Sequence, residues 1–144
     1  MNRLNVITLG VKDVKRSFAF FKAMGFQTAK DSMTTSDMVT FENQGSTLSL
    51  YPLDALRMDI SPSDAPKKQR GFNGLTLSYY CKTKAEVDTV LANAAKHGGT
   101  ILKPAEHAFW GGYRGYFADL DGYIFEVAYS EHFVFDKQDR VYYK

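Results

Sequence analysis

An aromatic, glycine-containing loop joined to a strand that carries a carboxylate is the part of this chain best suited to chemistry. Residues 109–113 are Phe-Trp-Gly-Gly-Tyr, and the segment after them alternates toward Glu126. Gly111 and Gly112 can adopt backbone conformations closed to other residues, which lets a ligand approach the chain. The aromatic side chains that would offer this ligand apolar faces and polar tips are Phe109, Trp110 and Tyr113. The segment predicts the floor of a small-molecule pocket, with a glycine-bent strand over an ordinary core as the alternative.

An internal repeat supplies the elements that would position these residues. Residues 5–9 and 73–77 share an alternating pattern at an offset of 68 residues, and an amphipathic helix pattern follows each of them. Asp13 and Thr83 are suitable N-caps, because their side-chain oxygens can accept hydrogen bonds from the orphan N–H groups of a first helical turn. Each half of the chain is therefore predicted to begin with a strand and a helix.

Three strand-like segments follow each predicted helix. In the first half they are residues 26–30, 38–42 and 47–51, and in the second half they are residues 100–103, 112–118 and 123–129. Gly45 and Gly122 end the tight turns that connect the last two strands of each set. Aligning these glycines places Ser49 opposite Glu126, at an offset of 77 residues. The resulting prediction is an α+β fold of two βαβββ modules in one chain.

We predict a single domain of residues 1–144, in which a linker joins the two modules and a tail follows the second. We place module 1 at about residues 1–52, the linker at about 53–70, module 2 at about 71–130 and the tail at 131–144. The linker contains Pro62 and Pro66 and has little periodicity. The tail is too aromatic for a free end, so we expect it to pack on the body of the protein or on a partner.

The composition excludes several classes of partner. A formal net charge of +2 without a basic stripe gives no nucleic-acid footprint. No apolar run approaches the roughly twenty residues that a membrane span needs. The single cysteine, Cys81, cannot form an internal disulfide and has no neighbour in sequence that would make it a nucleophile. Because no secretory signal pattern is present either, we expect a cytoplasmic protein.

The segments 8–26 and 115–127 resemble the vicinal oxygen chelate superfamily, which includes glyoxalase I, extradiol dioxygenases, fosfomycin-modifying enzymes and bleomycin-resistance proteins. The resemblance covers nearly the whole chain, and residues 109–113 resemble a glyoxalase-like, dioxygenase-related subgroup of unassigned substrate. It implies that each module curls its mixed sheet into a half-open cup. Two cups would then share one cavity, either within the chain or across a homodimer.

The resemblance also implies four ligand positions, which fall on Val6, Ser49, Gly74 and Glu126 in this sequence. Of these residues, Glu126 is a metal ligand of the usual kind. A catalytic zinc, nickel or iron needs about three ligands from His, Glu, Asp or Cys, so we predict no metal and no other cofactor. A divalent metal held by other donors is the alternative, and the candidates are His97, His107, His132 and Asp119.

Two functions follow from this resemblance. The first is a metal-independent protein that binds a small molecule, as the bleomycin-resistance members do, through Phe109, Trp110, Tyr113, Ser49, Tyr51 and Glu126. The second is a lyase, isomerase or dioxygenase-type enzyme acting on a small oxygenated substrate. Glu126 would then be a general base, or one ligand of a rearranged metal site, because burial in an aromatic cup disfavours its charged form. A structural Glu126 paired with Arg114 is the remaining interpretation.

Overall fold

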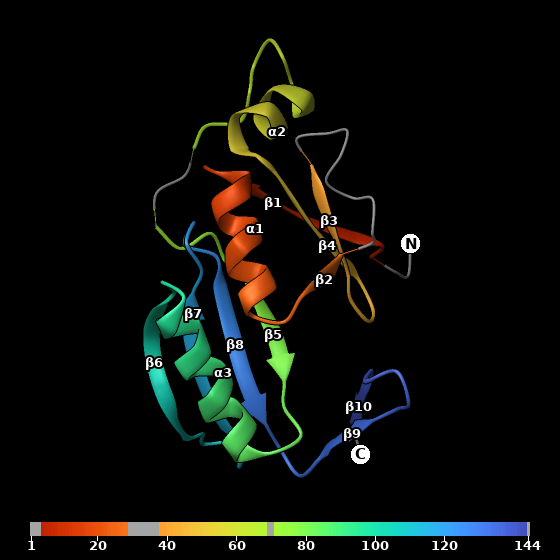
Figure 1. The fold of residues 1–144 in the computed structure, drawn as a ribbon, viewed down its shortest axis with the longest axis vertical. Coiled ribbons are helices and arrows are strands. Elements are labelled where there is room, and N and C mark those ends of the chain that lie inside the picture. Colours follow the sequence, from red (N-terminus) through yellow and green to blue (C-terminus); the bar gives the residue numbers. More distant parts are fainter. Residues whose placement is uncertain (1–3, 29–37, 69–70, 144) are drawn as a thin grey trace. The chain divides into compact units, whose positions relative to one another are not determined.

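The computed structural model describes residues 4–28, 38–68 and 71–143, and the chain divides into two compact units, Met1–Asn73 and Gly74–Lys144. Each unit contains a four-stranded mixed sheet with a helix after its first strand (Figure 1). The predicted α+β fold of two modules is therefore confirmed.

The sheet of the first unit has the strand order β1-β4-β3-β2. Its strands are β1 (Val6–Val11), β2 (Gln27–Thr28), β3 (Val39–Glu42) and β4 (Thr47–Pro52). β1 and β4 are parallel, whereas the β3–β4 and β2–β3 pairs are antiparallel. The helix α1 (Val14–Ala23) contributes Phe20 and Phe21 to the buried core.

The ends of α1 follow from local chemistry. Asp13 accepts a hydrogen bond from the Arg16 backbone N–H at 3.0 Å, which confirms the predicted N-cap. Gly25 follows the helix with a φ of +99°, a conformation that favours glycine. The Phe21 ring then lies 5.3 Å from Phe26 and 5.7 Å from Phe41. An aromatic cluster thus holds α1 on its own sheet.

A second helix, α2 (Leu53–Ile60), occupies residues that the sequence predicts to be a connection. None of its residues is fully buried, although Leu53, Leu56 and Ile60 recur at helical spacing over these eight residues. It lies close to β1 at Gly10, where a Cβ would be 2.8 Å from Leu53 Cδ1 and 3.2 Å from Leu56 Cδ2. A helix of eight residues is marginal by itself, so packing on this glycine helps to stabilise it.

The sheet of the second unit has the strand order β5-β8-β7-β6. Its strands are β5 (Thr76–Tyr80), β6 (Thr100–His107), β7 (Tyr113–Ala118) and β8 (Ile124–Tyr129). β5 and β8 are parallel, and the other two pairs are antiparallel. β6 is longer than predicted, because two register shifts let it continue beyond Lys103.

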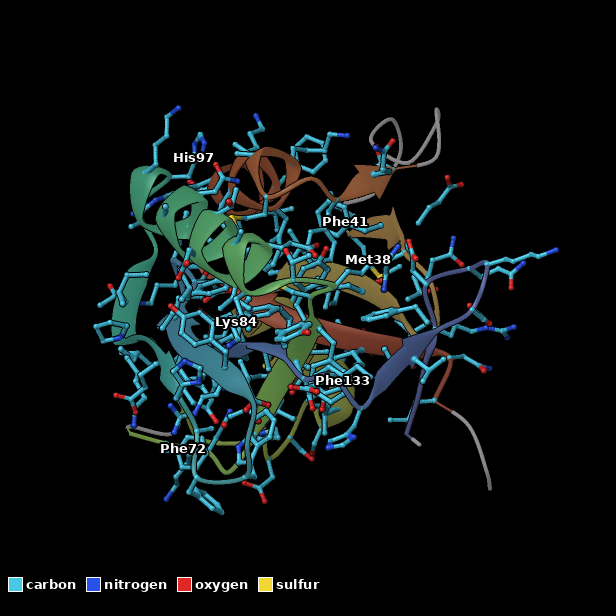
Figure 2. All side chains as sticks on the ribbon, turned by 90° about the horizontal axis from the view of Figure 1, so that it is seen from below. Met38, Phe41, Phe72, Lys84, His97 and Phe133 are labelled. Atoms are coloured by element: carbon cyan, nitrogen blue, oxygen red, sulfur yellow. The ribbon has the colours of Figure 1, made fainter. Side chains whose placement is uncertain are left out.

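The helix α3 (Lys84–Lys96) covers one face of this sheet (Figure 1). Thr83 accepts a hydrogen bond from the Glu86 backbone N–H at 3.1 Å, so the second predicted N-cap is also confirmed. Buried apolar residues from the helix and the sheet form this core, namely Val87, Leu91, Ala94, Phe117, Phe125 and Val127. Figure 2 shows Lys84 and His97 at opposite ends of α3.

The C-terminal segment forms a hairpin of β9 (Phe133–Phe135) and β10 (Val141–Tyr143). Phe133 stacks on Tyr80 with ring centroids 4.3 Å apart, and Lys82 lies over the Phe135 ring at 5.6 Å. The tail therefore packs on the body of the second unit, as expected. Among the described helices, none is both long and apolar enough to cross a membrane.

Candidate functional site

Glu126 lies on β8 between two strands that each give it a hydroxyl donor. Ser78 on β5 and Tyr116 on β7 are its direct partners in the strand register. The Ser78 hydroxyl donates to Glu126 Oε2 at 3.0 Å, and the Tyr116 hydroxyl donates to Oε1 at 2.9 Å. Because each carboxylate oxygen has two lone-pair sites, Glu126 can still accept hydrogen bonds from a ligand. Ser78, Glu126 and Tyr116 are called the charged row below.

Alternation along β8 separates the charged row from the core of the unit. Phe125 and Val127 are buried beneath α3, so Glu126 between them projects from the opposite face. Ser78 and Tyr80 share this face on β5, where Tyr80 is paired with Ala128. The sheet therefore presents its carboxylate on the face that α3 leaves uncovered.

A hollow of about 230 Å³ lies on this face of the second unit. Its lining residues are Tyr80, Trp110, Glu126, Ala128 and Phe133. The rings of Trp110 and Phe133 have centroids 6.4 Å apart, and Phe133 also stacks on Tyr80. The hollow thus has three aromatic rings and one carboxylate, which combines apolar walls with a polar group that can orient a ligand.

Two glycines place the Trp110 indole at the hollow. Gly111 has a φ of +91° and donates its N–H to the Ala108 carbonyl at 3.0 Å, which closes a tight turn. A Cβ at Gly112 would lie 1.7 Å from Trp110 Cζ3. The Trp110 indole, and not a ligand, therefore packs against the Gly112 backbone. Gly111 uses its conformational freedom to form the turn.

Arg114 does not pair with Glu126. Its guanidinium donates to Glu106 at 3.0 Å and lies 5.6 Å from the centre of the Tyr116 ring. Hydrogen bonds from Lys103 and then Arg114 lower the pKa of Glu106. Throughout residues 4–28, 38–68 and 71–143, Glu126 forms no salt bridge.

Tyr116 remains a hydrogen-bond donor in this row. Burial raises the pKa of its phenol, the hydrogen bond to Glu126 raises it further, and the nearby Arg114 opposes the rise. The protonated phenol is the form that can donate to a carboxylate. Tyr116 therefore fixes the carboxylate in place.

Phe109 and Tyr113 are two predicted binding residues that the structure does not bring to the hollow. The Phe109 side chain is 99% exposed at the tip of the loop. Tyr113 donates its hydroxyl to Asp88 on α3 at 2.9 Å, which places it on the helix-covered face. Of the three aromatic residues predicted to contact a ligand in this segment, Trp110 is the one that lines the hollow.

Ser49 and Tyr51 lie in the first unit, on β4. Ser49 is paired with Thr8 on β1 and with Thr40 on β3, and its hydroxyl lies 3.0 Å from that of Thr40. These three residues are called the hydroxyl row. Ser49 is 1% exposed, and Tyr51 is paired with Gly10.

The register corrects two of the four positions taken from the resemblance. Thr8 is paired with Ser49 and Ser78 is paired with Glu126, so these first strands align at an offset of 70 residues instead of 68. Val6 is paired with Thr47 instead, and Gly74 precedes β5 with a φ of +80°. Gly74 adopts a backbone conformation that favours glycine. Ser78, and not Gly74, is the β5 residue beside Glu126.

The donors of the two rows do not fit a catalytic zinc, nickel or iron. The hydroxyl row has no charged ligand, and the charged row has one carboxylate where such a metal needs about three ligands from His, Glu, Asp or Cys. Among the described residues, no three His, Cys, Asp or Glu side chains come together. The alternative donors are dispersed: His97 follows α3, His107 ends β6, His132 precedes β9 and Asp119 lies in the β7–β8 turn.

The sequence of this chain matches a family model over residues 3–127, and that model describes the glyoxalase/bleomycin resistance protein/dioxygenase superfamily. The chain belongs to this superfamily. The predicted resemblance is thus confirmed. A comparison of this superfamily member with curated proteins gave no match.

Solved structures share the fold of this superfamily member. A glyoxalase-related enzyme from Fulvimarina pelagi is 24% identical, with a TM-score of 0.86 and 99% of each chain covered. A glyoxalase/bleomycin resistance protein/dioxygenase family enzyme from Burkholderia phytofirmans PsJN is 18% identical, with a TM-score of 0.74 over 88% of this chain and 98% of the other. A hypothetical protein from S. aureus is 23% identical, with a TM-score of 0.76 over 90% and 95%.

Three contributors to the site in this superfamily member escape the sequence prediction: Tyr80, Phe133 and Ser78. A register set by Glu126 would have identified Ser78 as its partner and Tyr80 as the next residue on the same face. Phe133 reaches the hollow through tertiary packing of the hairpin, for which its own sequence gives no signal.

Proposed function

We propose that this superfamily member binds a small molecule in the hollow of its second unit and does so without a metal. The observation that supports this most is the hollow itself, in which aromatic rings surround a carboxylate held by two hydroxyls. Aromatic walls supply contact area, and Glu126 supplies direction. A binding role agrees with the presence of bleomycin resistance proteins in this superfamily.

The chemistry around the hollow favours binding over covalent catalysis. Cys81 is fully buried, and burial raises the pKa of its thiol to about 12. A thiolate is needed for nucleophilic attack, so Cys81 is an inert core residue. The residues that line the hollow include no His, Ser or Cys that could serve as a nucleophile.

A second candidate function is an enzyme of lyase, isomerase or dioxygenase type. It is favoured by the pairing of Glu126 with the phenol of Tyr116 at 2.9 Å, because a carboxylate beside a hydroxyl can take up and return a proton. In this case turnover would fall sharply in Glu126→Gln, while the affinity for the substrate would change less.

The binding proposal is tested by native mass spectrometry of the purified protein, followed by calorimetric titration of any small molecule that it carries. Trp110→Ala should lower the affinity by about 1–3 kcal/mol, because an indole wall is lost. Phe109→Ala is the matched control, since it removes a fully exposed ring from the same loop and should leave the affinity unchanged.

Metal independence has its own experiment. The titration is repeated after exhaustive chelation, and the affinity should not change. Tight binding of one equivalent of zinc, nickel, manganese or iron, lost in Glu126→Ala, would overturn this part of the proposal. A ligand that binds equally well to Trp110→Ala would move the binding site away from the hollow.

We also propose a cytoplasmic homodimer. The resemblance to proteins whose cups pair within a chain or across a two-fold axis supports the dimer, and a free buried Cys81 is compatible with a reducing compartment. Light scattering of the purified protein tests the assembly, and a monomeric mass across the concentration range would contradict it.

A further inference from the structure

We propose that the hollow of the second unit recognises an organic cation, such as a methylated ammonium group carried on a small aromatic or aliphatic molecule. This inference rests on the proposed binding function and specifies the class of ligand. It rests on three observations. Aromatic rings line the hollow, Glu126 supplies a carboxylate, and the Lys and Arg side chains near it form salt bridges with other carboxylates.

The aromatic walls come from three separate segments that converge on Glu126. Tyr80 ends β5, Trp110 lies in the β6–β7 loop and Phe133 begins β9. The faces of aromatic rings carry partial negative charge and attract cations within about 6 Å. Several rings around one carboxylate form a site in which a cation is favoured over a neutral group of the same shape.

None of the described Lys and Arg side chains forms a salt bridge with Glu126. Lys82 lies over the Phe135 ring but pairs with Asp139, and Arg114 lies over the Tyr116 ring but pairs with Glu106. Glu106 is also bound by Lys103 at 2.9 Å. In the part of the chain that the structure describes, the partners of the Glu126 carboxylate are thus the neutral hydroxyls of Ser78 and Tyr116.

The hydroxyl donors prepare this carboxylate for a ligand without neutralising it. Each donates to one oxygen, so the carboxylate has a fixed direction. A ligand cation at the hollow would complete the charge balance. A ligand carboxylate or phosphate would face Glu126 and be repelled.

The size of the hollow limits the ligand. Its volume of about 230 Å³ is below the range of roughly 300–1,000 Å³ that is typical of sites for drug-sized molecules. A headgroup such as a trimethylammonium with one attached ring is a suitable probe for a hollow of this volume.

The test uses a pair of probes that differ in charge and share a shape, para-hydroxyphenyltrimethylammonium and para-tert-butylphenol. Binding is followed by calorimetry near neutral pH and by the fluorescence of Trp110, which is the single tryptophan of the chain. The cationic probe should bind about tenfold more tightly than the neutral one, since cation–π and charge attraction act on it alone.

Substitution of Glu126 isolates the source of this preference. Glu126→Gln should remove most of the difference between the probes, because it should lower the affinity for the cationic probe far more than the affinity for the neutral one. Glu131→Gln is the matched control, because it removes the same charge from an exposed position in the same unit. The comparison of the two probes on the unsubstituted protein remains decisive if Glu126→Gln fails to fold.

The outcomes separate this inference from the binding function on which it rests. Equal or tighter binding of the neutral probe to the unsubstituted protein would overturn the cation preference while keeping the hollow as a binding site. Failure of both probes would also overturn the inference. The binding function itself would fail if native mass spectrometry found no small molecule whose retention depends on Trp110.

Discussion

The phenol of Tyr116 on β7 donates a hydrogen bond of 2.9 Å to the Glu126 carboxylate on β8, directly across the sheet. The same carboxylate receives a second bond from Ser78 on the other neighbouring strand. The acidic group is thereby held by the regular geometry of three paired strands. A side chain fixed in this way loses little further freedom when a ligand arrives, which favours affinity.

Removing the Tyr116 hydroxyl should weaken both the sheet and the site. Tyr116→Phe is expected to lower the free energy of unfolding by about 0.5–1.5 kcal/mol, as for the loss of one partly buried hydrogen bond. Ligand affinity should fall as well, because Glu126 loses one of its two fixed donors. Urea denaturation and calorimetry measure the two effects. Tyr129→Phe, which removes a phenol from the same sheet outside the charged row, serves as the control.

Gly112 should be intolerant of any side chain. The Cβ of Gly112→Ala would overlap the Trp110 indole at 1.7 Å, so the indole should leave the hollow and its fluorescence maximum should shift to the red. Gly111→Ala provides the contrast, since its strained φ of +91° should cost about 1–2 kcal/mol of stability without displacing the ring. An unshifted spectrum for Gly112→Ala would contradict the packing of Trp110 on this glycine.

Asp119 should make the stability of the protein depend on pH. Burial raises the pKa of this carboxyl from 3.8 to about 6, against the opposing effect of backbone N–H donors from Tyr123 and Asp121. Between these two values the folded chain binds a proton that the unfolded chain has released, so stability should fall as the pH rises from about 4 to 6. The difference corresponds to roughly 3 kcal/mol at most.

Asp119→Asn should abolish this pH dependence, since the amide does not titrate. Urea denaturation at several pH values would measure it for both proteins. Parallel stability curves between about pH 4 and 6 would show that Asp119 does not titrate in this range. Glu131→Gln, which removes an exposed acid of the same unit outside this turn, controls for a general effect of charge.

Cys81 should react with alkylating reagents no faster than the protein opens. Its side chain is 0% exposed, and its pKa is raised to about 12 by burial. We expect slow labelling in the native state and fast labelling in denaturant, measured by mass spectrometry over time. Rapid labelling at neutral pH under native conditions would contradict the burial of the thiol.

The local signals in the sequence predicted the elements that local chemistry controls. Asp13 and Thr83 cap their helices, and Gly45 and Gly122 adopt the positive φ values that their turns require. These features depend on a few neighbouring residues, so a single sequence contains them. The order of elements within each module follows from them.

Features that depend on distant residues were harder to predict. The helix α2 is held by close packing at Gly10, and Phe133 reaches the hollow only through the fold of its hairpin. The position on the first strand of each module was predicted from sequence similarity. The prediction was wrong by two residues in the first module, where it selected Val6 instead of Thr8, and by four in the second, where it selected Gly74 instead of Ser78. Glu126 was identified because it is the one carboxylate in the repeat position.

The hydroxyl row and the charged row occupy equivalent positions in their respective sheets, with Ser49 at the centre of one and Glu126 at the centre of the other. The two sheets therefore share their strand arrangement, but the carboxylate is present in the second sheet and not at the equivalent position of the first. If Glu126 is required for binding, each chain takes up a single ligand molecule. A homodimer would then saturate at two ligands, although it contains four such sheets.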